Sequence, residues 1–221
     1  MKLPFFSRLA AGLMLLGLSA CVSSGRSPEV ALQPLEPFTY EQRHVIAVLP
    51  FEYTGEQKKY DEFSGKLDDL AIVEIFNSKR FRVVERSRID AVLEEIRLGQ
   101  AGITNDEIAY QVGQQLGAEM VLVGTMSSVK AIHDRDSLGI AVSESKGIEV
   151  SLQGRLIDVA KGEILAVGNS TGLEIQQTKV AMGASTGIIA PETTLVNLAL
   201  EKAVKNLVNQ LAGSIGPKTS L

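Results

Sequence analysis

One cysteine carries the clearest chemistry in this sequence, and its neighbours indicate what that chemistry is. Cys21 directly follows Leu18-Ser19-Ala20 and is the only cysteine in the 221 residues. An apolar residue, two small residues and a cysteine form the lipobox pattern, at which a signal peptidase cuts before a lipid-modified thiol. We therefore expect cleavage between Ala20 and Cys21 and attachment of diacylglycerol to the Cys21 sulfur. The alternative is an ordinary cysteine beside an ordinary leader, but a lone thiol in an exported chain has no internal disulfide partner.

The residues before Cys21 have the build of a cleavable secretory signal. Lys2 and Arg8 precede an apolar run over residues 9–18, which is too short to span a membrane as a helix. Val22 follows the cysteine, where an Asp would be the usual signal for retention in the inner membrane. We therefore expect a lipid anchor in the outer membrane, with the protein facing the periplasm. Three acyl chains on one cysteine would anchor it stably, because each buried CH2 contributes about 0.8 kcal/mol.

The rest of the chain offers little material for catalysis or ligand chemistry. His44 and His133 are the two histidines, and they lie far apart in the sequence. We therefore expect no metal site, no nucleophile–base pair, no cofactor and no enzyme activity. Without residues 1–20 the chain has 20 basic and 26 acidic residues, a net charge of about −6. No basic cluster exceeds the Lys58-Lys59 pair or the scattered arginines of residues 80–88, so nucleic acid is not an expected partner.

The chain divides into a signal, a tether, one folded domain and a tail. Residues 1–20 form the signal, and residues 21–43, with three prolines, predict a lipidated flexible tether. Residues 44–213 predict a single α/β domain, and residues 214–221 a short tail. Apolar runs and alternation predict strands over residues 44–49, 81–85, 118–126, 148–156 and 163–177. Helical spacing of apolar residues predicts helices over residues 60–77, 87–99, 104–116 and 193–211, with Thr104 and Glu107 as a capping box. This order of elements predicts a mixed sheet.

Several stretches of this domain resemble the curli secretion lipoprotein family of the CsgG type, which includes holdfast-anchoring relatives. The similar stretches are Ile-Ala-Val-Leu-Pro-Phe at residues 46–51, Arg-Phe-Arg-Val-Val-Glu-Arg at 80–86, the run from Gly113 to Gly124, and residues 156–165. They occur in the order of the family and span about 120 residues. The resemblance implies a periplasmic domain of anticodon-binding-domain-like α/β fold. It also implies a ring of subunits, each giving two β-hairpins to an outer-membrane pore through which unfolded amyloid subunits pass.

The segments that would form such hairpins here are residues 127–147 and 168–190. A strand that crosses a bilayer needs about 9–11 residues of alternation, and membrane strands usually carry aromatic residues at both interfaces. Neither segment has an aromatic residue, and Asp134, Arg135 and Asp136 crowd the first. Two interpretations remain: hairpins that enter the membrane, or a sheet extension and a loop outside it.

The resemblance also implies a constriction formed by residues after the first strand. In the curli member that ring contains Tyr, Asn and Phe, and the corresponding region here is residues 53–63. Tyr53, Tyr60 and Phe63 are the candidates, although Phe63 suits a core position equally well.

Two functions follow from these observations. The first is an outer-membrane lipoprotein that acts as a homo-oligomeric ring in export or assembly of extracellular fibres or adhesins, with a secreted or surface protein as client. The second is a tethered periplasmic interaction module that forms no pore, such as a peptidoglycan-synthase activator.

Overall fold

The computed structural model describes residue 32 and residues 34–99, 105–138, 140–182 and 184–219. The predicted signal, its cleavage position at Ala20, the lipidation residue Cys21 and the capping residue Thr104 lie outside the described residues.

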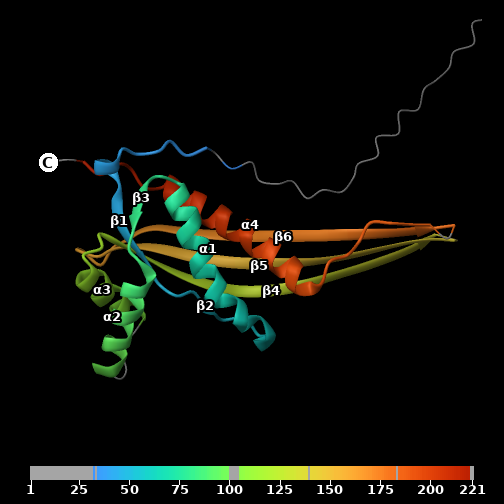
Figure 1. Cartoon of the computed structure of the whole chain (residues 1–221), viewed down its shortest axis with the longest axis horizontal. Helices are drawn as coiled ribbons and strands as arrows, with labels where there is room; N and C mark the ends of the chain where they lie inside the picture. Colours follow the sequence, from blue (N-terminus) through green and yellow to red (C-terminus); the bar gives the residue numbers. More distant parts are fainter. Residues whose placement is uncertain (1–31, 33, 100–104, 139, 183, 220–221) are drawn as a thin grey trace, which may run out of the picture. The chain divides into compact units, whose positions relative to one another are not determined.

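Among these described residues, the domain is built on one mixed sheet of seven strands (Figure 1). The strands are β1 (His44–Val48), β2 (Glu52–Tyr53), β3 (Phe81–Val83), β4 (Met120–Leu138), β5 (Ala141–Asp158), β6 (Ile164–Ala181) and β7 (Ala184–Thr186). The sheet order is β3-β1-β4-β5-β6-β7, and β2 also pairs with β4. Pairs of β1 with β3 and β4, and of β2 with β4, are parallel, whereas the later pairs are antiparallel. The predicted mixed α/β sheet is confirmed.

In the part of the chain that the structure describes, four α-helices and two short 3-10 helices accompany the sheet. They are η1 (Tyr40–Gln42), η2 (Lys58–Phe63), α1 (Ser64–Asn77), α2 (Arg86–Gly99), α3 (Asn105–Leu116) and α4 (Glu192–Gly213). All four predicted helices are present, although η2 takes the first residues of the helix predicted over 60–77.

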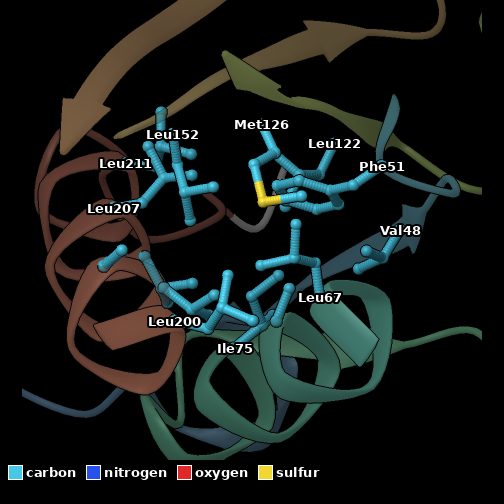
Figure 2. Packing of buried hydrophobic residues seen from close by; sticks show 14 of the residues in the cluster. Val48, Phe51, Leu67, Ile75, Leu122, Met126, Leu152, Leu200, Leu207 and Leu211 are labelled. Atoms are coloured by element: carbon cyan, nitrogen blue, oxygen red, sulfur yellow. The ribbon is translucent and has the colours of Figure 1, made fainter. Parts of the chain in front are cut away.

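Helices cover both faces of the sheet where the parallel strands lie, which explains why residues 45–48 of β1 are all apolar. Leu67 and Ile75 of α1 and Leu207 of α4 pack on one face (Figure 2). The other face packs against α2 and α3 and contains Ala47 and Val121. A strand that is buried on both faces carries a continuous apolar run rather than an alternating one.

The antiparallel strands are much longer than the sequence predicted. The strand expected over residues 118–126 is only the first part of β4, which continues to Leu138, and β5 begins at Ala141 rather than at residue 148. Beyond the helices, β4, β5 and β6 form a three-stranded extension (Figure 1). Residues 127–147 are thus a β-hairpin, and residues 168–181 are a third strand beside it and not a loop. Entry of these strands into a membrane stays a prediction.

The folded part begins before His44 and continues past Gly213, which corrects both predicted boundaries. Phe38 is buried, its backbone N–H donates to the carbonyl of Lys79, and Leu35 packs against the core. Ile215 is buried as well, and the backbone N–H of Lys218 donates to the carbonyl of Gln42. No apolar period marks these short segments in the sequence, because each of them buries a single side chain against distant residues.

Candidate functional site

The long antiparallel part of the sheet is the first candidate site, and we call it the distal ribbon; its base packs against α4 and its far part projects beyond the helices (Figure 1). It consists of residues 128–138 of β4, 141–151 of β5 and 171–181 of β6, which pair in a regular register. A β-bulge at Met126/Ser128 precedes it. The pairing of β2 with β4 ends at Met126, and no described strand pairs with the same edge of β4 beyond that point. The ribbon therefore has an open edge along β4.

Both faces of the distal ribbon carry charged groups. On the face that continues the α4 side, Glu144 accepts from His133 at 3.0 Å and lies 3.2 Å from the Lys146 ammonium. On the opposite face, Lys130 lies 3.4 Å from Glu149. Asp134, Asp136 and Lys179 are exposed on that same face. Val129, Ile148 and Val150 are buried at the base of the ribbon. Beyond them both faces are at least partly exposed, so the far part of the ribbon offers water-compatible contacts.

The end of the ribbon differs from its shaft because its side chains are uncharged. Ile140 is 70 % exposed and Met182 is 86 % exposed. Ala141 of β5 pairs with Ala181 of β6. Ile140, which precedes Ala141, and Met182, which follows Ala181, therefore lie at neighbouring turns. Val180 is exposed beside them.

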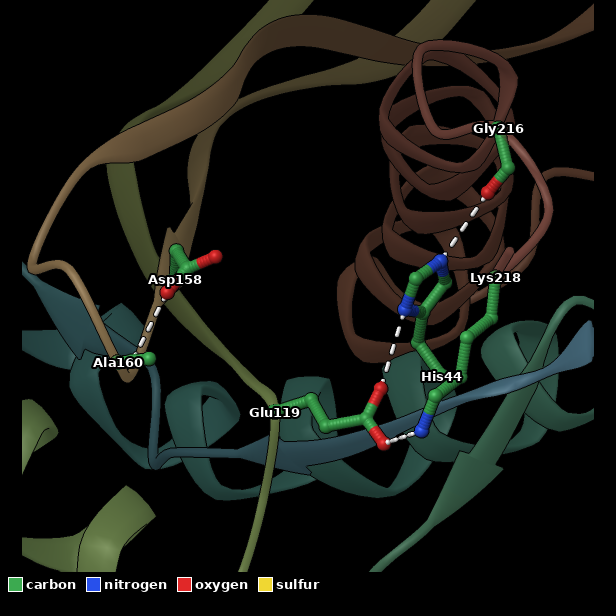
Figure 3. Close-up of polar contacts among 6 residues, drawn as sticks. All are labelled: His44, Glu119, Asp158, Ala160, Gly216 and Lys218. Atoms are coloured by element: carbon green, nitrogen blue, oxygen red, sulfur yellow. Dashed lines mark hydrogen bonds and ion pairs between the residues drawn. The ribbon is translucent and has the colours of Figure 1, made fainter. Parts of the chain in front are cut away.

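The second candidate site is a polar cluster where the two ends of the folded chain meet, and we call it the terminal junction. It consists of His44, Glu119, Gly216 and Lys218 (Figure 3). The Nδ1 and Nε2 atoms of His44 lie 3.1 Å from a Glu119 carboxylate oxygen and 3.1 Å from the Gly216 carbonyl oxygen. The Lys218 ammonium donates to the other Glu119 oxygen. Burial alone would raise the pKa of Glu119, but the hydrogen bonds from Lys218 and His44 outweigh it and lower the pKa.

Arg80 fastens the same region from the side of β3. Its guanidinium donates to the carbonyls of Ala212 at 2.7 Å and Ile215 at 2.9 Å, and to that of Glu36 at 3.0 Å. It also lies over the ring of Phe38 at 4.3 Å. Arg80 thus caps the C-terminal end of α4, and it joins the segment before β1 to the segment after α4. From the sequence, Arg80 is predicted to lie at a solvated strand edge. Its actual partners could not be recognised there because they lie far away in the chain.

An open hollow of about 430 Å³ lies beside the junction, and its lining includes Gln114, Asp158 and Lys218. The Asp158 carboxylate accepts from the backbone N–H groups of Ala160 and Lys161 at 2.8 and 2.9 Å (Figure 3). Gln114 donates to the carbonyl of Val159 at 3.3 Å. These groups hold the turn between β5 and β6, so the hollow is lined by polar side chains already engaged in structure.

A buried ion pair fixes the loop that follows β1. Asp68 of α1 is 3 % exposed; one of its oxygens accepts from the N–H of Phe51 at 2.7 Å and the other lies 3.0 Å from the Arg86 guanidinium. Burial raises the pKa of Asp68, and the Phe51 N–H and Arg86 offset part of that rise. This contact holds the start of the segment that was predicted to form a constriction.

The structure places the three constriction candidates in different environments. Tyr60 and Phe63 are core residues, 2 % and 4 % exposed, and the Tyr60 hydroxyl donates to Glu192 of α4 at 2.7 Å. In this protomer neither ring faces solvent, so the expectation that both line a channel needs correction, because the 3-10 helix η2 turns them inward. Tyr53 is half-buried in β2, and its role at a constriction stays a prediction.

The described residues contain no group of histidine, cysteine and acidic side chains that could hold a metal ion. Within the same residues, no helix is both long enough and apolar enough to cross a membrane.

The fold and these sites define a class of protein: a single mixed α/β domain that carries a long three-stranded ribbon on one side of its sheet. Within that class, the family described as the curli production assembly/transport component CsgG matches residues 32–218, and the chain belongs to this family. The resemblance seen in the sequence is confirmed.

Solved structures that resemble the chain are distant in sequence. The LpoB C-terminal domain from Salmonella enterica is 17 % identical, with a TM-score of 0.40 over 61 % of this chain and 86 % of its own. Lipoprotein GNA1162 from Neisseria meningitidis is 17 % identical, with a TM-score of 0.41 over 77 % of this chain and 99 % of its own. The PelC dodecamer from Paraburkholderia phytofirmans is 9 % identical, with a TM-score of 0.39 over 83 % and 95 %. No curated protein matches the chain by sequence.

Proposed function

We propose that this protein is a lipid-anchored component of the outer membrane, facing the periplasm, that acts in export or assembly of extracellular fibres or adhesins. It acts as a ring of identical subunits and has no catalytic role. Membership of the CsgG family supports the transport or assembly part of this proposal. The lipobox at Cys21 supports the anchor.

The open edge of β4 is the observation that carries the ring. The Met126 carbonyl accepts from the N–H of Thr54 on the side away from β5. Beyond the bulge, Val129 lies on the same face as Met126, so we expect the backbone groups of Val129, Ala131 and His133 to point away from β5 as well. An unpaired edge of this length is a template for another strand. At the far side of the sheet, β6 and β7 present a second edge. The β6–β7 edge of one copy can therefore pair with the open β4 edge of the next copy.

Electron microscopy of the detergent-extracted, lipidated protein tests the ring. We expect closed rings, and a protein that stays monomeric at all concentrations would refute this part of the proposal. Ala131→Pro removes one outward amide donor at the exposed edge and should abolish rings, because proline cannot donate to a neighbouring strand. Ala131→Ser keeps that amide and is the matched control, in which rings should persist.

The anchor has its own test. Cys21→Ser should leave the protein unprocessed or detached from the outer membrane, as followed by fractionation and by labelling with radioactive palmitate. If the Cys21→Ser protein were processed and membrane-bound like the wild type, the lipoprotein assignment would be wrong, whatever the state of assembly.

A second function is favoured by the charges on the ribbon. Residues such as Arg135 and Asp136 point to opposite faces of the same strand, so neither face offers an apolar band to lipid. That pattern supports an interaction module that forms no pore, such as a peptidoglycan-synthase activator. Ion conductance across planar bilayers separates the two: a stable conductance supports a pore, and its absence from preparations that contain rings supports the module.

A further inference from the structure

The uncharged end of the distal ribbon is a feature that neither proposed function uses. We call it the apolar cap and define it as residues 137–138, 140–142 and 180–182. We propose that the apolar cap inserts shallowly into the lipid surface of a membrane and that the charged shaft behind it stays in water.

The depth of the cap is set by the register of the strands. Asp136, Ser143 and Lys179 lie side by side on one rung, and this is the last charged rung before the end. Beyond it the strands add only two further rungs and the two turns. At about 3.4 Å per residue, the uncharged section is roughly 7–10 Å deep.

That depth fits the boundary between headgroups and acyl chains and does not fit a crossing. Interfacial segments bury their apolar side by about 5–10 Å, whereas a hydrocarbon core is about 30 Å thick. Ile140 and Met182 are the large side chains at the end of the ribbon, and both are mostly exposed in the protomer. These two apolar side chains are therefore accessible to a lipid surface at the end of the ribbon.

Lipid is a better occupant for the cap than a second copy of the chain. A stable protein interface takes about 20–30 residues from each side, and the cap is far smaller than that. Lipid requires no complementary shape. The lipid expected on Cys21 also keeps the domain near a membrane surface, because only residues 22–33, about 40 Å when extended, separate the two.

The absence of tryptophan from the sequence makes the test clean. Ile140→Trp gives a single fluorophore at the cap, and Phe76→Trp, on an exposed position of α1, gives the matched control. Both are made in the full lipidated chain and reconstituted in phosphatidylcholine vesicles whose acyl chains carry bromine at shallow or deep positions.

We expect shallow bromines to quench most of the emission of the Ile140→Trp protein, deep bromines to quench much less, and neither to quench the Phe76→Trp protein. Met182→Trp should show the same quenching as Ile140→Trp. Agreement between the two variants would show that the quenching does not come from a local structural change at residue 140. Adding Met182→Glu to Ile140→Trp should remove most of the quenching, whereas adding Val73→Glu on α1 should leave it unchanged.

Three results would overturn the inference. Equal emission with and without bromine would show that the cap stays in water. Stronger quenching by deep bromines would show that the ribbon spans the bilayer. A blue shift of the Ile140→Trp emission that depends on protein concentration in detergent, without vesicles, would assign the cap to another copy. None of these results depends on whether rings form, so this inference can fail separately from the proposed function.

Discussion

Replacing Asp68 should test whether the buried ion pair holds the loop after β1. Asp68→Ala leaves the buried N–H of Phe51 without its acceptor, which costs about 1–3 kcal/mol. Breaking a fully buried pair costs about 3–5 kcal/mol, but Arg86 is 35 % exposed and keeps Asp69 at 3.1 Å. We therefore expect a loss of about 2–4 kcal/mol in the free energy of unfolding. Asp68→Asn keeps an acceptor for the Phe51 N–H and should lose only about 1–2 kcal/mol.

Urea unfolding of the full chain, followed by circular dichroism, measures these differences. With a slope of about 2 kcal/mol per molar urea, Asp68→Ala should lower the midpoint by roughly 1–2 M. The control is Asp69→Ala, which removes a neighbouring carboxylate that is 73 % exposed and contacts the same Arg86. It should change stability by less than about 1 kcal/mol. Equal losses for Asp68→Asn and Asp68→Ala would refute the reasoning, because the Phe51 N–H would then contribute nothing.

Three further substitutions probe the packing and the polar contacts. Gly172→Ala places a Cβ against the backbone of α4 and should lower the free energy of unfolding by about 3 kcal/mol or more, or prevent folding. The control Gly65→Ala places its Cβ in open space and should not destabilise the protein, and thermal unfolding compares the two variants. Glu119 has a lowered pKa, so its stabilising contribution is present above its ordinary value of 4.5 and is lost as the pH falls through the lower folded value. Urea midpoints of Glu119→Gln and wild type should therefore differ at pH 7 and converge as the pH falls through the folded pKa, and an unchanged gap would contradict this. Tyr60→Phe removes the hydrogen bond to Glu192 and should cost about 1 kcal/mol in a thermal melt, and no change would show that water replaces the bond.

The sequence predicted the elements that are buried by helices. The run at residues 44–49 was recognised because β1 is covered on both faces, and α4 because its apolar side chains recur at helical spacing. Both signals come from contact with one continuous core. They place the elements correctly even though the sequence contains no information about the partners across the core.

The distal ribbon was only partly predicted because its far part has no dry face. Residues 130–137 alternate between two exposed sides, so charged residues such as Asp134, Arg135 and Asp136 obscure the period of two that identifies a half-buried strand. In the sequence, only the length of such a segment distinguishes it from a loop. The register in which β4 pairs is set by β5 and not by a pattern within β4.

The terminal junction was not predictable for a different reason. Glu119, Arg80 and Lys218 are ordinary surface residues by sequence, and their partners lie 75 or more residues away along the chain, except for the contact of Arg80 with Glu36. Charged pairs of this kind have no local spacing. The buried Asp68–Arg86 pair escaped notice likewise, since nothing in the sequence marks Asp68 as more buried than Asp69.

The open edge of β4 links the anchor to assembly. Proteins usually protect a long edge with charges, bulges or a covering segment, and this edge has a bulge at its base and charged side chains along it. Such protection disfavours random pairing in solution. The lipid proposed on Cys21 would change the balance, because it would confine copies to one surface in similar orientation and so raise their effective concentration without any new contact. The same guarded edge can therefore stay unpaired in a dilute soluble protein and still pair with a neighbour that is anchored beside it.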